Sequence, residues 1–348
     1  MTALGAAAVA AADPTGQMAE TLGLGEHLRD ALWRVDSAGI APVDAASGLI
    51  VAGMGGSGVG GRLAQAALRP CLRRPVLVAD GYSLPRWVGD DALVLCTSYS
   101  GATEETLAAY DDAARRRAPR LAATTGGPLA ERARRDGVPV IPLPGGFQPR
   151  AAVGYTLVAA LEAAALCGAA PSLRGDVEAA AALAERLARE WGPDGEEESA
   201  PKRLARRLEG TVPVIAGAEL ATAAAYRWKS MLNENAEVPA FAAALPEADH
   251  NDVVGWARAR ELAPFGVVVL EDPHADPRNA RRAELTAELA LRGAAVVERV
   301  TAVGETSLER LVSLVLLGDL VSLYLAVLRG VDPAQVRVID DLKSNLAQ

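Results

Sequence analysis

Short apolar runs alternate with amphipathic helical stretches along most of the chain, and this alternation constrains the fold more than any other feature. In the first half, the apolar runs are residues 48–52, 75–79, 93–97, 120–124 and 138–143. Apolar residues at helical spacing mark the intervening residues 59–68, 103–117 and 128–135. Strands that alternate with helices chain into βαβ units, which form a parallel sheet covered by helices. The first half is therefore predicted to be a three-layer α/β/α domain.

The same alternation restarts in the second half. Strands are expected at residues 212–216, 266–271 and 295–300, and helices at residues 219–232, 279–291 and 307–329. No strict sequence repeat relates the halves, yet both predict the same architecture. A helical lead-in covers about residues 18–35, and helices at about 151–166 and 177–191 separate the halves. We expect an extension and lead-in at 1–40, a first domain at 41–168, a helical linker at 169–200, and a second domain with a C-terminal tail at 201–348.

Composition supports two α/β domains and excludes one class of partner. Half of the 348 residues are apolar, and single cores stop growing somewhere below roughly 300 residues. Only 4% of residues are aromatic, so the cores are built from small aliphatic side chains, as in helices covering parallel strands. The net charge of −9 argues against a nucleic-acid partner, because phosphate neutralisation needs a basic face.

The chain shows no secretory or membrane signal of the usual kind. Residues 1–12 are Ala-rich but lack a charged n-region, so we expect a cytoplasmic protein. The longest apolar candidate, residues 311–328, contains Asp319 and is predicted to be a buried helix instead of a membrane span. Cys71, Cys96 and Cys167 form no CxxC pair and have no His at metal-ligand spacing. They are predicted to be reduced core residues, and no metal is expected.

A glycine-rich segment follows the first predicted strand and precedes a helix. Residues 53–61 read GMGGSGVGG, which includes Gly56 and Ser57. Glycines let the backbone approach a ligand closely, and the exposed amides of a helix N-terminus attract an anion. The alternatives are a plain tight turn or a dinucleotide-binding GxGxxG. The dinucleotide alternative lacks an acidic residue in the usual place, since Asp80 follows the next strand and precedes a loop. We therefore predict a phosphate-binding turn.

A second polar turn follows the third predicted strand. Residues 97–106 read TSYSGATEET, and the hydroxyls of Ser98, Ser100 and Thr103 surround one turn. Ser100 or Thr103 could simply cap the following helix, but capping does not require so many hydroxyls. Because the carboxyl ends of neighbouring parallel strands meet at one edge of a sheet, the two turns predict a phosphate cup there.

The order of these motifs carries a specific resemblance. Residues 148–150 read QPR, 233–237 NENAE, 246–251 PEADHN and 339–343 IDDLK. With GMGGSG and SYSGxTEET, the chain resembles the bifunctional phosphoglucose/phosphomannose isomerase family from about residue 13 onward. The resemblance implies two sugar isomerase (SIS) domains with parallel sheets. It also implies interconversion of glucose 6-phosphate and mannose 6-phosphate with fructose 6-phosphate through a cis-enediol, without metal or cofactor. A homodimer with active sites near the subunit interface is the expected assembly.

The resemblance also assigns roles to four residues. Glu234 matches the family's proton shuttle between C1 and C2, and Arg150 matches the arginine that stabilises the enediolate beside a glycine-loop amide, here that of Gly56. His250 and Lys343 match residues that assist ring opening. Without the motifs, a carboxylate at a helix end is usually solvated, and Arg150 would be taken as part of a surface ion pair. The other histidines, His27 and His274, match no motif and are expected on the surface.

The chain departs from the family pattern at two places. First, Ala102 replaces the asparagine of SYSGNT. Second, Val336 and Arg337 stand where family members often have Thr-Pro, and the threonine of that pair is connected with accepting both C2 epimers. Mannose 6-phosphate activity is therefore the less secure expectation.

A non-catalytic SIS-domain sensor and an isomerase of another phosphosugar remain alternatives. Sensors usually carry a DNA-binding domain, and the residues before 48 are too few and too acidic for one. An aminotransferring hexosamine-phosphate synthase would need an amidotransferase domain with an N-terminal nucleophilic Cys.

Overall fold

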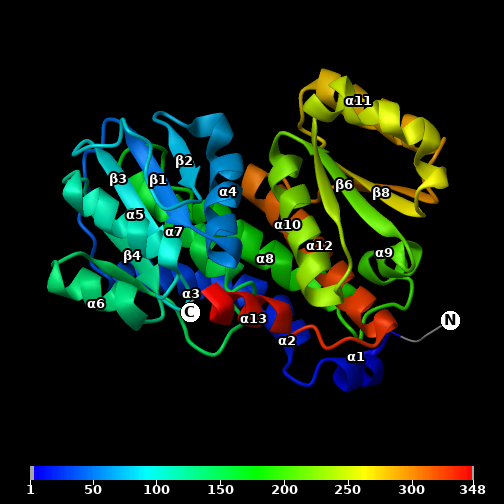
Figure 1. Cartoon of the computed structure of the whole chain (residues 1–348), viewed down its shortest axis with the longest axis horizontal. Helices are drawn as coiled ribbons and strands as arrows, with labels where there is room; N and C mark the ends of the chain where they lie inside the picture. Colours follow the sequence, from blue (N-terminus) through cyan, green and yellow to red (C-terminus); the bar gives the residue numbers. More distant parts are fainter. Residues whose placement is uncertain (1–3, 347–348) are drawn as a thin grey trace. The chain divides into compact units, whose positions relative to one another are not determined.

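The chain folds into two compact units, each assembled from separate stretches of sequence (Figure 1). The computed structural model describes residues 4–346, apart from the side chains of residues 340, 343, 344 and 346. The five-stranded unit comprises Gly23–Glu185 and Gly304–Glu309. The four-stranded unit comprises the described residues up to Leu22, Arg186–Val303, and the described residues from Arg310. The domain bounds expected from the sequence stay predictions.

The five-stranded unit contains all five strands predicted for the first half. They are β1 Gly48–Gly53, β2 Val76–Ala79, β3 Ala92–Thr97, β4 Arg120–Thr124 and β5 Val140–Pro142. The strands are parallel and lie in the order β2-β1-β3-β4-β5. β1 and β3 are buried along their whole length, as expected for a parallel sheet covered on both faces.

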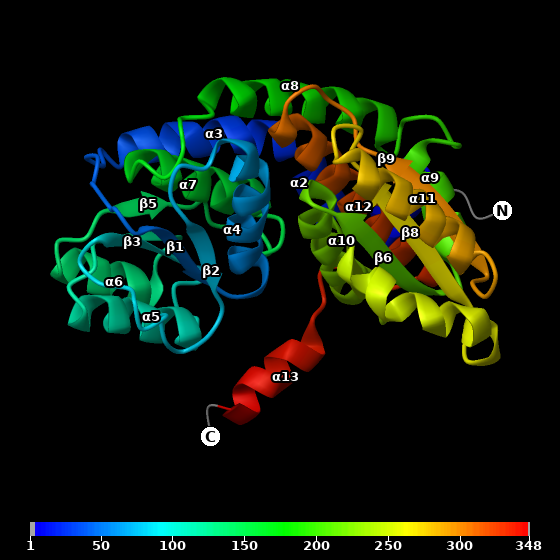
Figure 2. The same cartoon turned by 90° about the horizontal axis from the view of Figure 1, so that it is seen from above.

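Helices cover both faces of this sheet, which confirms the three-layer prediction (Figure 2). One face carries α4 Gly55–Leu68 and α7 Val153–Leu166, with α3 Leu24–Ser37 packed against α7. The other face carries α5 Glu104–Arg115 and α6 Gly127–Arg135. Side chains of β1 divide between the layers: Ile50 belongs to the cluster beneath α5 and α6, while Val51 lies against Gly61 of α4. A short 3-10 turn, η1 Arg69–Cys71, ends α4.

The four-stranded unit repeats the topology of the first sheet. Its strands are β6 Val212–Ala218, β7 Phe241–Leu245, β8 Phe265–Glu271 and β9 Val296–Thr301. They are parallel in the order β7-β6-β8-β9, which matches β2-β1-β3-β4. The prediction that the halves are structural relatives is confirmed. Strand β7 was not predicted because its sequence, FAAAL, lacks the β-branched residues that mark strands.

Helices also connect the parallel strands of the four-stranded unit. The main ones are α9 Ala200–Leu208, α10 Leu220–Ala236, α11 Pro277–Ala290, α12 Ser307–Arg329 and α13 Arg337–Leu346. Shorter elements are α1 Ala6–Ala12, α2 Gln17–Leu22, η2 Glu247–His250 and η3 Asp252–Glu261, and α8 Arg174–Trp191 contains residues of both units. α10 leads from β6 to β7 and α11 from β8 to β9, in opposite directions along the sheet. Right-handed crossovers therefore place α10 and α11 on opposite faces.

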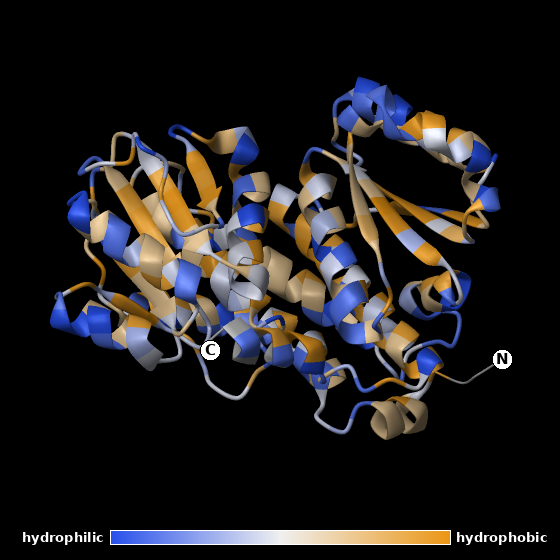
Figure 3. Cartoon of the chain, viewed as in Figure 1, coloured by the Kyte–Doolittle hydropathy of each residue, from blue (hydrophilic) through white to orange (hydrophobic). Residues whose placement is uncertain are grey.

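Helix α12 is long and apolar enough to cross a membrane, but it is buried in the core of the protein. Of its most apolar window, 89% is buried. Within that helix, Asp319 accepts a hydrogen bond of 2.7 Å from the buried Arg227 of α10. Figure 3 shows that apolar residues are buried elsewhere too: the strands are hydrophobic, whereas outer helices such as α6 and α11 carry hydrophilic residues. The prediction of a buried helix at this position is confirmed.

Candidate active site

The glycine-rich turn after β1 forms the beginning of α4. The helix begins at Gly55, four residues before the predicted start, so Gly56 and Ser57 lie in its first turn. The amide of Ser57 donates to the carbonyl of Met54 at 3.0 Å, and the N-terminal end of the helix carries a partial positive charge. A Cβ on Gly56 would lie 3.0 Å from the carbonyl oxygen of Pro149 and 3.1 Å from the nitrogen of Arg150. A glycine is therefore what allows the turn containing Arg150 to approach this helix end.

The hydroxyls of the two predicted turns are brought together at the carboxyl edge of the sheet. Ser57 Oγ accepts a hydrogen bond of 3.1 Å from the amide of Tyr99. Ser98 Oγ and Thr103 Oγ1 are hydrogen-bonded at 2.8 Å, and Ser98 is fully buried. Ser100 is exposed, and its Oγ accepts from the amide of Ala102 at 3.2 Å. Accepting a bond leaves a serine hydroxyl its own proton to donate, so this turn suits an anion.

Arg150 lies in the turn between β5 and α7. Because α7 begins at Val153, Arg150 precedes this helix, which was expected to begin at about residue 151. The residue is only 4% exposed, which does not fit the alternative of an ordinary surface ion pair. Arg150 is instead a buried arginine whose backbone lies against Gly56 of the glycine-rich turn, and its guanidinium keeps its positive charge at neutral pH.

Glu234 lies inside the last turn of α10, not beyond the helix end as predicted. The helix continues to Ala236 because Asn235 donates to Ser322 Oγ of α12 at 2.9 Å and Asn233 donates to the carbonyl of Lys229 at 2.7 Å. Glu234 is half-buried. With Asn233, Glu237 and residues 335–339, it lines a cavity of about 580 Å³.

The remaining two predicted residues lie elsewhere in the four-stranded unit. His250 ends the 3-10 segment η2 after β7, is exposed, and is not among the described residues that line the Glu234 cavity. Lys343 belongs to α13, but its side chain lies outside the described part of the structure. The structure therefore gathers the predicted phosphate-binding residues and Arg150 in the five-stranded unit, whereas Glu234, His250 and Lys343 belong to the four-stranded unit.

The predicted surface position of His27 is wrong. His27 was expected on the surface but is only 8% exposed, whereas His274 is exposed as expected. The ring of His27 lies 4.9 Å from that of Phe147 and 5.3 Å from that of Tyr155. Burial lowers the pKa of His27, and the charges of neighbouring acidic residues offset this only in part. The missed signal was its place on the apolar face of α3, beside Leu24 and Leu28.

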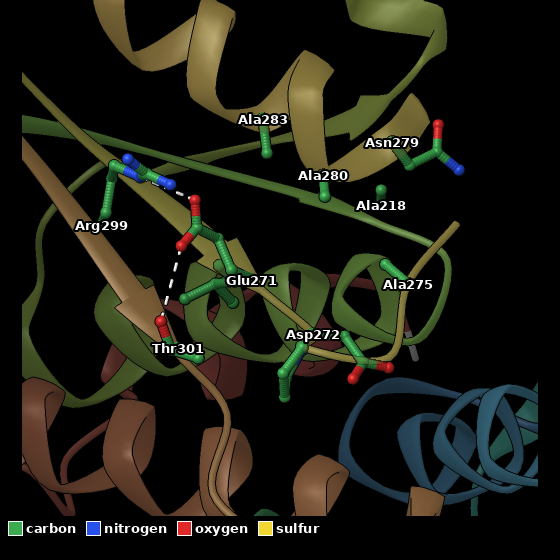
Figure 4. A pocket seen from close by; sticks show the side chains of 11 residues that line it. Ala218, Glu271, Asp272, Ala275, Asn279, Ala280, Ala283, Arg299 and Thr301 are labelled. Atoms are coloured by element: carbon green, nitrogen blue, oxygen red, sulfur yellow. Dashed lines mark hydrogen bonds and ion pairs between the residues drawn. The ribbon is translucent and has the colours of Figure 1, made fainter. Parts of the chain in front are cut away.

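A second hollow lies at the carboxyl ends of β6, β8 and β9, in the four-stranded unit (Figure 4). Its volume is about 140 Å³. Glu271 accepts a bond of 2.7 Å from Arg299 Nε, and Asn279 donates to Glu219 at 2.7 Å. These polar groups bind one another and include carboxylates, so the hollow does not repeat the phosphate cup of the first sheet. Among the described residues, no group of three or more His, Cys, Asp or Glu could hold a metal ion.

Comparisons with known proteins agree with this geometry. A family model described as the bacterial phospho-glucose isomerase C-terminal SIS domain matches residues 197–346. A bifunctional phosphoglucose/phosphomannose isomerase of Caldicellulosiruptor bescii is 38% identical over 303 residues, covering 86% of this chain and 89% of that protein. The chain belongs to the bifunctional phosphoglucose/phosphomannose isomerase family. Its two units are accordingly tandem SIS-type domains.

A second family member and a solved structure of the same fold extend the comparison. A bifunctional phosphoglucose/phosphomannose isomerase of Aquifex aeolicus is 35% identical over 300 residues and aligns with 86% of this chain and 90% of its own length. A hypothetical protein of Thermus thermophilus shares the fold, with a TM-score of 0.72 at 19% identity, covering 95% of this chain and 90% of that one. The whole two-domain architecture is therefore shared, beyond the matched C-terminal domain.

Proposed function

We propose that the chain interconverts glucose 6-phosphate, and also mannose 6-phosphate, with fructose 6-phosphate. The reaction proceeds by metal-free proton transfer through a cis-enediol. The observation that carries the proposal is the joining of two polar turns and the buried Arg150 at one edge of the five-stranded sheet. Family membership supplies the reaction class, since the relatives are named as phosphoglucose/phosphomannose isomerases.

Phosphate binding is assigned to the two turns. Ser100 offers an exposed hydroxyl, and Ser57, Ser98 and Thr103 supply further hydroxyls from the same two turns. The first turn of α4 adds amides and the positive end of its dipole. Hydrogen bonds to a charged phosphate are stronger than those between neutral groups, so this set can hold the phosphate without a metal.

Proton transfer is assigned to Glu234 and Arg150. With the sugar ring open, the Glu234 carboxylate removes the proton from C2 of the aldose, and the electron pair forms the enediolate, whose charge develops on oxygen. The guanidinium of Arg150 and the amide of Gly56 stabilise that charge. Glu234 then returns the proton to C1, while the proton of the C2 hydroxyl passes to the enediolate oxygen on C1, so that the C2 carbonyl of the ketose and its C1 hydroxyl form together. His250 and Lys343 are assigned to proton transfer at the ring oxygen during opening.

The proposal also covers the substrate range, the cellular location and the assembly of the protein. Val336 lines the cavity of Glu234, where many family members have threonine, so mannose 6-phosphate is expected to react more slowly than glucose 6-phosphate. The loss of the Asn side chain at Ala102 is expected to weaken phosphate binding slightly. We propose a cytoplasmic homodimer with active sites near the subunit interface.

The direct test is an assay of the purified chain with fructose 6-phosphate, with formation of glucose 6-phosphate and of mannose 6-phosphate followed separately by coupled enzymes. The proposal expects glucose 6-phosphate to form, and the rate to survive prolonged treatment with a chelator. Binding of fructose 6-phosphate with no product of either kind would contradict it in favour of a sensor. Loss of activity on chelation, restored by zinc, would contradict the metal-free mechanism.

A further inference from the structure

Within the second polar turn, Tyr99 hydrogen-bonds to the turns that follow β1, β4 and β5 of the five-stranded unit. We propose that Tyr99 is a positioning residue, whose hydroxyl fixes the turn that contains Arg150 relative to the phosphate-binding turns. The inference rests on the role proposed above for Arg150. Tyr99 is not assigned any contact with the phosphate or with the reacting carbons.

The backbone of Tyr99 ties three turns together. Its amide donates to Ser57 Oγ of the glycine-rich turn at 3.1 Å. Its carbonyl accepts from the amide of Thr125, after β4, at 3.1 Å and from Thr125 Oγ1 at 2.8 Å. These bonds do not depend on the identity of the side chain, so they survive any substitution that leaves the ring in place.

The phenol group reaches the fourth turn, which leads to Arg150. Tyr99 Oη donates to the carbonyl of Pro144 at 2.9 Å and accepts from the amide of Phe147 at 2.8 Å. Both partners lie in residues 144–150, between β5 and α7. A single hydroxyl thus closes the segment, using both its donor and its acceptor capacity.

This segment needs such a restraint. It contains Gly145 and Gly146, and Gly146 has φ +97°, a conformation that few other residues adopt. Glycine also loses the most conformational freedom on folding, so the segment resists being fixed. The Phe147 ring, packed edge-on against His27 at 4.9 Å, is a further anchor of the segment. Without the phenol hydroxyl, two backbone groups lose their partner at the point where the chain turns toward Arg150.

The expected consequence is kinetic. The enediolate charge exists only in the reaction, so a displaced Arg150 weakens transition-state binding more than substrate binding. Displacement of a charged group by about 1 Å can lower a rate by about 100-fold. The phosphate-binding turns keep their bonds through the Tyr99 backbone, so affinity for the substrate is preserved.

The test compares Tyr99→Phe with Tyr110→Phe. Tyr110 lies in α5 of the same unit, and its hydroxyl donates to Asp136 at 3.0 Å. With fructose 6-phosphate, Tyr99→Phe should lower kcat by about 10- to 100-fold and change KM by less than about threefold. Tyr110→Phe loses one hydroxyl in the same unit and should keep wild-type kcat. In an Arg150→Ala background, Tyr99→Phe should change kcat by less than about threefold, because both changes act through one residue.

Amide hydrogen exchange gives a readout that does not need catalysis. Residues 144–150 should exchange faster in Tyr99→Phe than in the wild type or in Tyr110→Phe. Unaltered exchange there, a wild-type kcat, or an effect on KM alone would each overturn the proposal. If the wild-type chain fails to isomerise fructose 6-phosphate, the proposed function fails instead, and the exchange rates alone decide whether Tyr99 holds this turn.

Discussion

At the scale of single residues, the hydroxyls of the phosphate-binding turns have different tasks. Ser57 and Ser98 are buried and bond to neighbouring backbone or side chains, so they also shape the turns. Ser100 is exposed, which leaves it as the hydroxyl best placed for a ligand. The sequence indicated these residues because they follow strands and precede helices. It did not indicate Tyr99, because its role depends on a loop more than forty positions further along the chain.

Ser100→Ala tests this division of tasks. The lost donor serves the ground state and the transition state alike, so KM for fructose 6-phosphate should rise about tenfold with little change in kcat. Steady-state kinetics measure both values. Ser37→Ala, an exposed serine of the same unit that bonds only its own helix backbone at Arg34 in the described contacts, is the matched control. Unchanged KM and kcat in Ser100→Ala would remove this residue from the site.

His27 predicts a loss of stability in mild acid. Burial lowers its pKa below the ordinary value of 6.5, although the charges of Glu26 and Asp30 act in the opposite direction. As pH falls below about 6.5, the unfolded chain takes up this proton before the folded chain does, so the free energy of unfolding falls. The fall continues until the pH reaches the lowered pKa of the folded state.

Thermal unfolding at a series of pH values measures this effect. His27→Leu should reduce the dependence of the unfolding midpoint on pH between about 5 and about 7, because the buried titrating group is gone. His274→Gln, a change at an exposed histidine, should leave the dependence as in the wild type. An undiminished dependence in His27→Leu would show that His27 is not its source.

At the scale of elements, α10 shows why helix ends are hard to predict. Asn is a weak helix former, so the NEN sequence predicted an end at residue 232. The helix continues because α12 supplies partners: Ser322 for Asn235, and Arg329 Nε, which donates to the carbonyl of Ala236 at 2.8 Å. Tertiary contacts of this kind leave no local trace in the sequence. The strands with β-branched residues were predicted, whereas the Ala-rich β7 was not.

Nearer the middle of α10, the ion pair between Arg227 and Asp319 is buried on both sides. Asp319→Asn leaves the guanidinium without its counter-charge, which should lower the free energy of unfolding by about 3–5 kcal/mol. Urea unfolding followed by circular dichroism measures this change. The control is Glu190→Gln, which breaks an exposed pair with Arg186 and should cost less than about 1 kcal/mol. Equal effects of the two variants would argue against a role of the buried pair in joining α10 to α12.

At the scale of the whole molecule, the chain does not divide at a single linker. The described residues up to Leu22 belong to the four-stranded unit, and Gly304–Glu309 to the five-stranded unit. Leu4, for example, is fully buried, although its surroundings in the sequence are an Ala-rich extension. The sequence predicted the two related sheets because periodicity is local. It could not predict which distant segments complete each unit, because that choice depends on packing between residues far apart in the chain.

If Glu234 is the base that moves the proton on the hexose phosphate, Glu234→Gln should lower the kcat for fructose 6-phosphate. Glutamine keeps the size and hydrogen bonding of the side chain but cannot accept the proton. The account predicts a fall in kcat of about 10² to 10⁴, the usual contribution of a positioned general base, with little change in KM. Glu237→Gln, a change in a carboxylate lining the same cavity, should remain near wild type. A Glu234→Gln enzyme with near wild-type kcat would contradict the account.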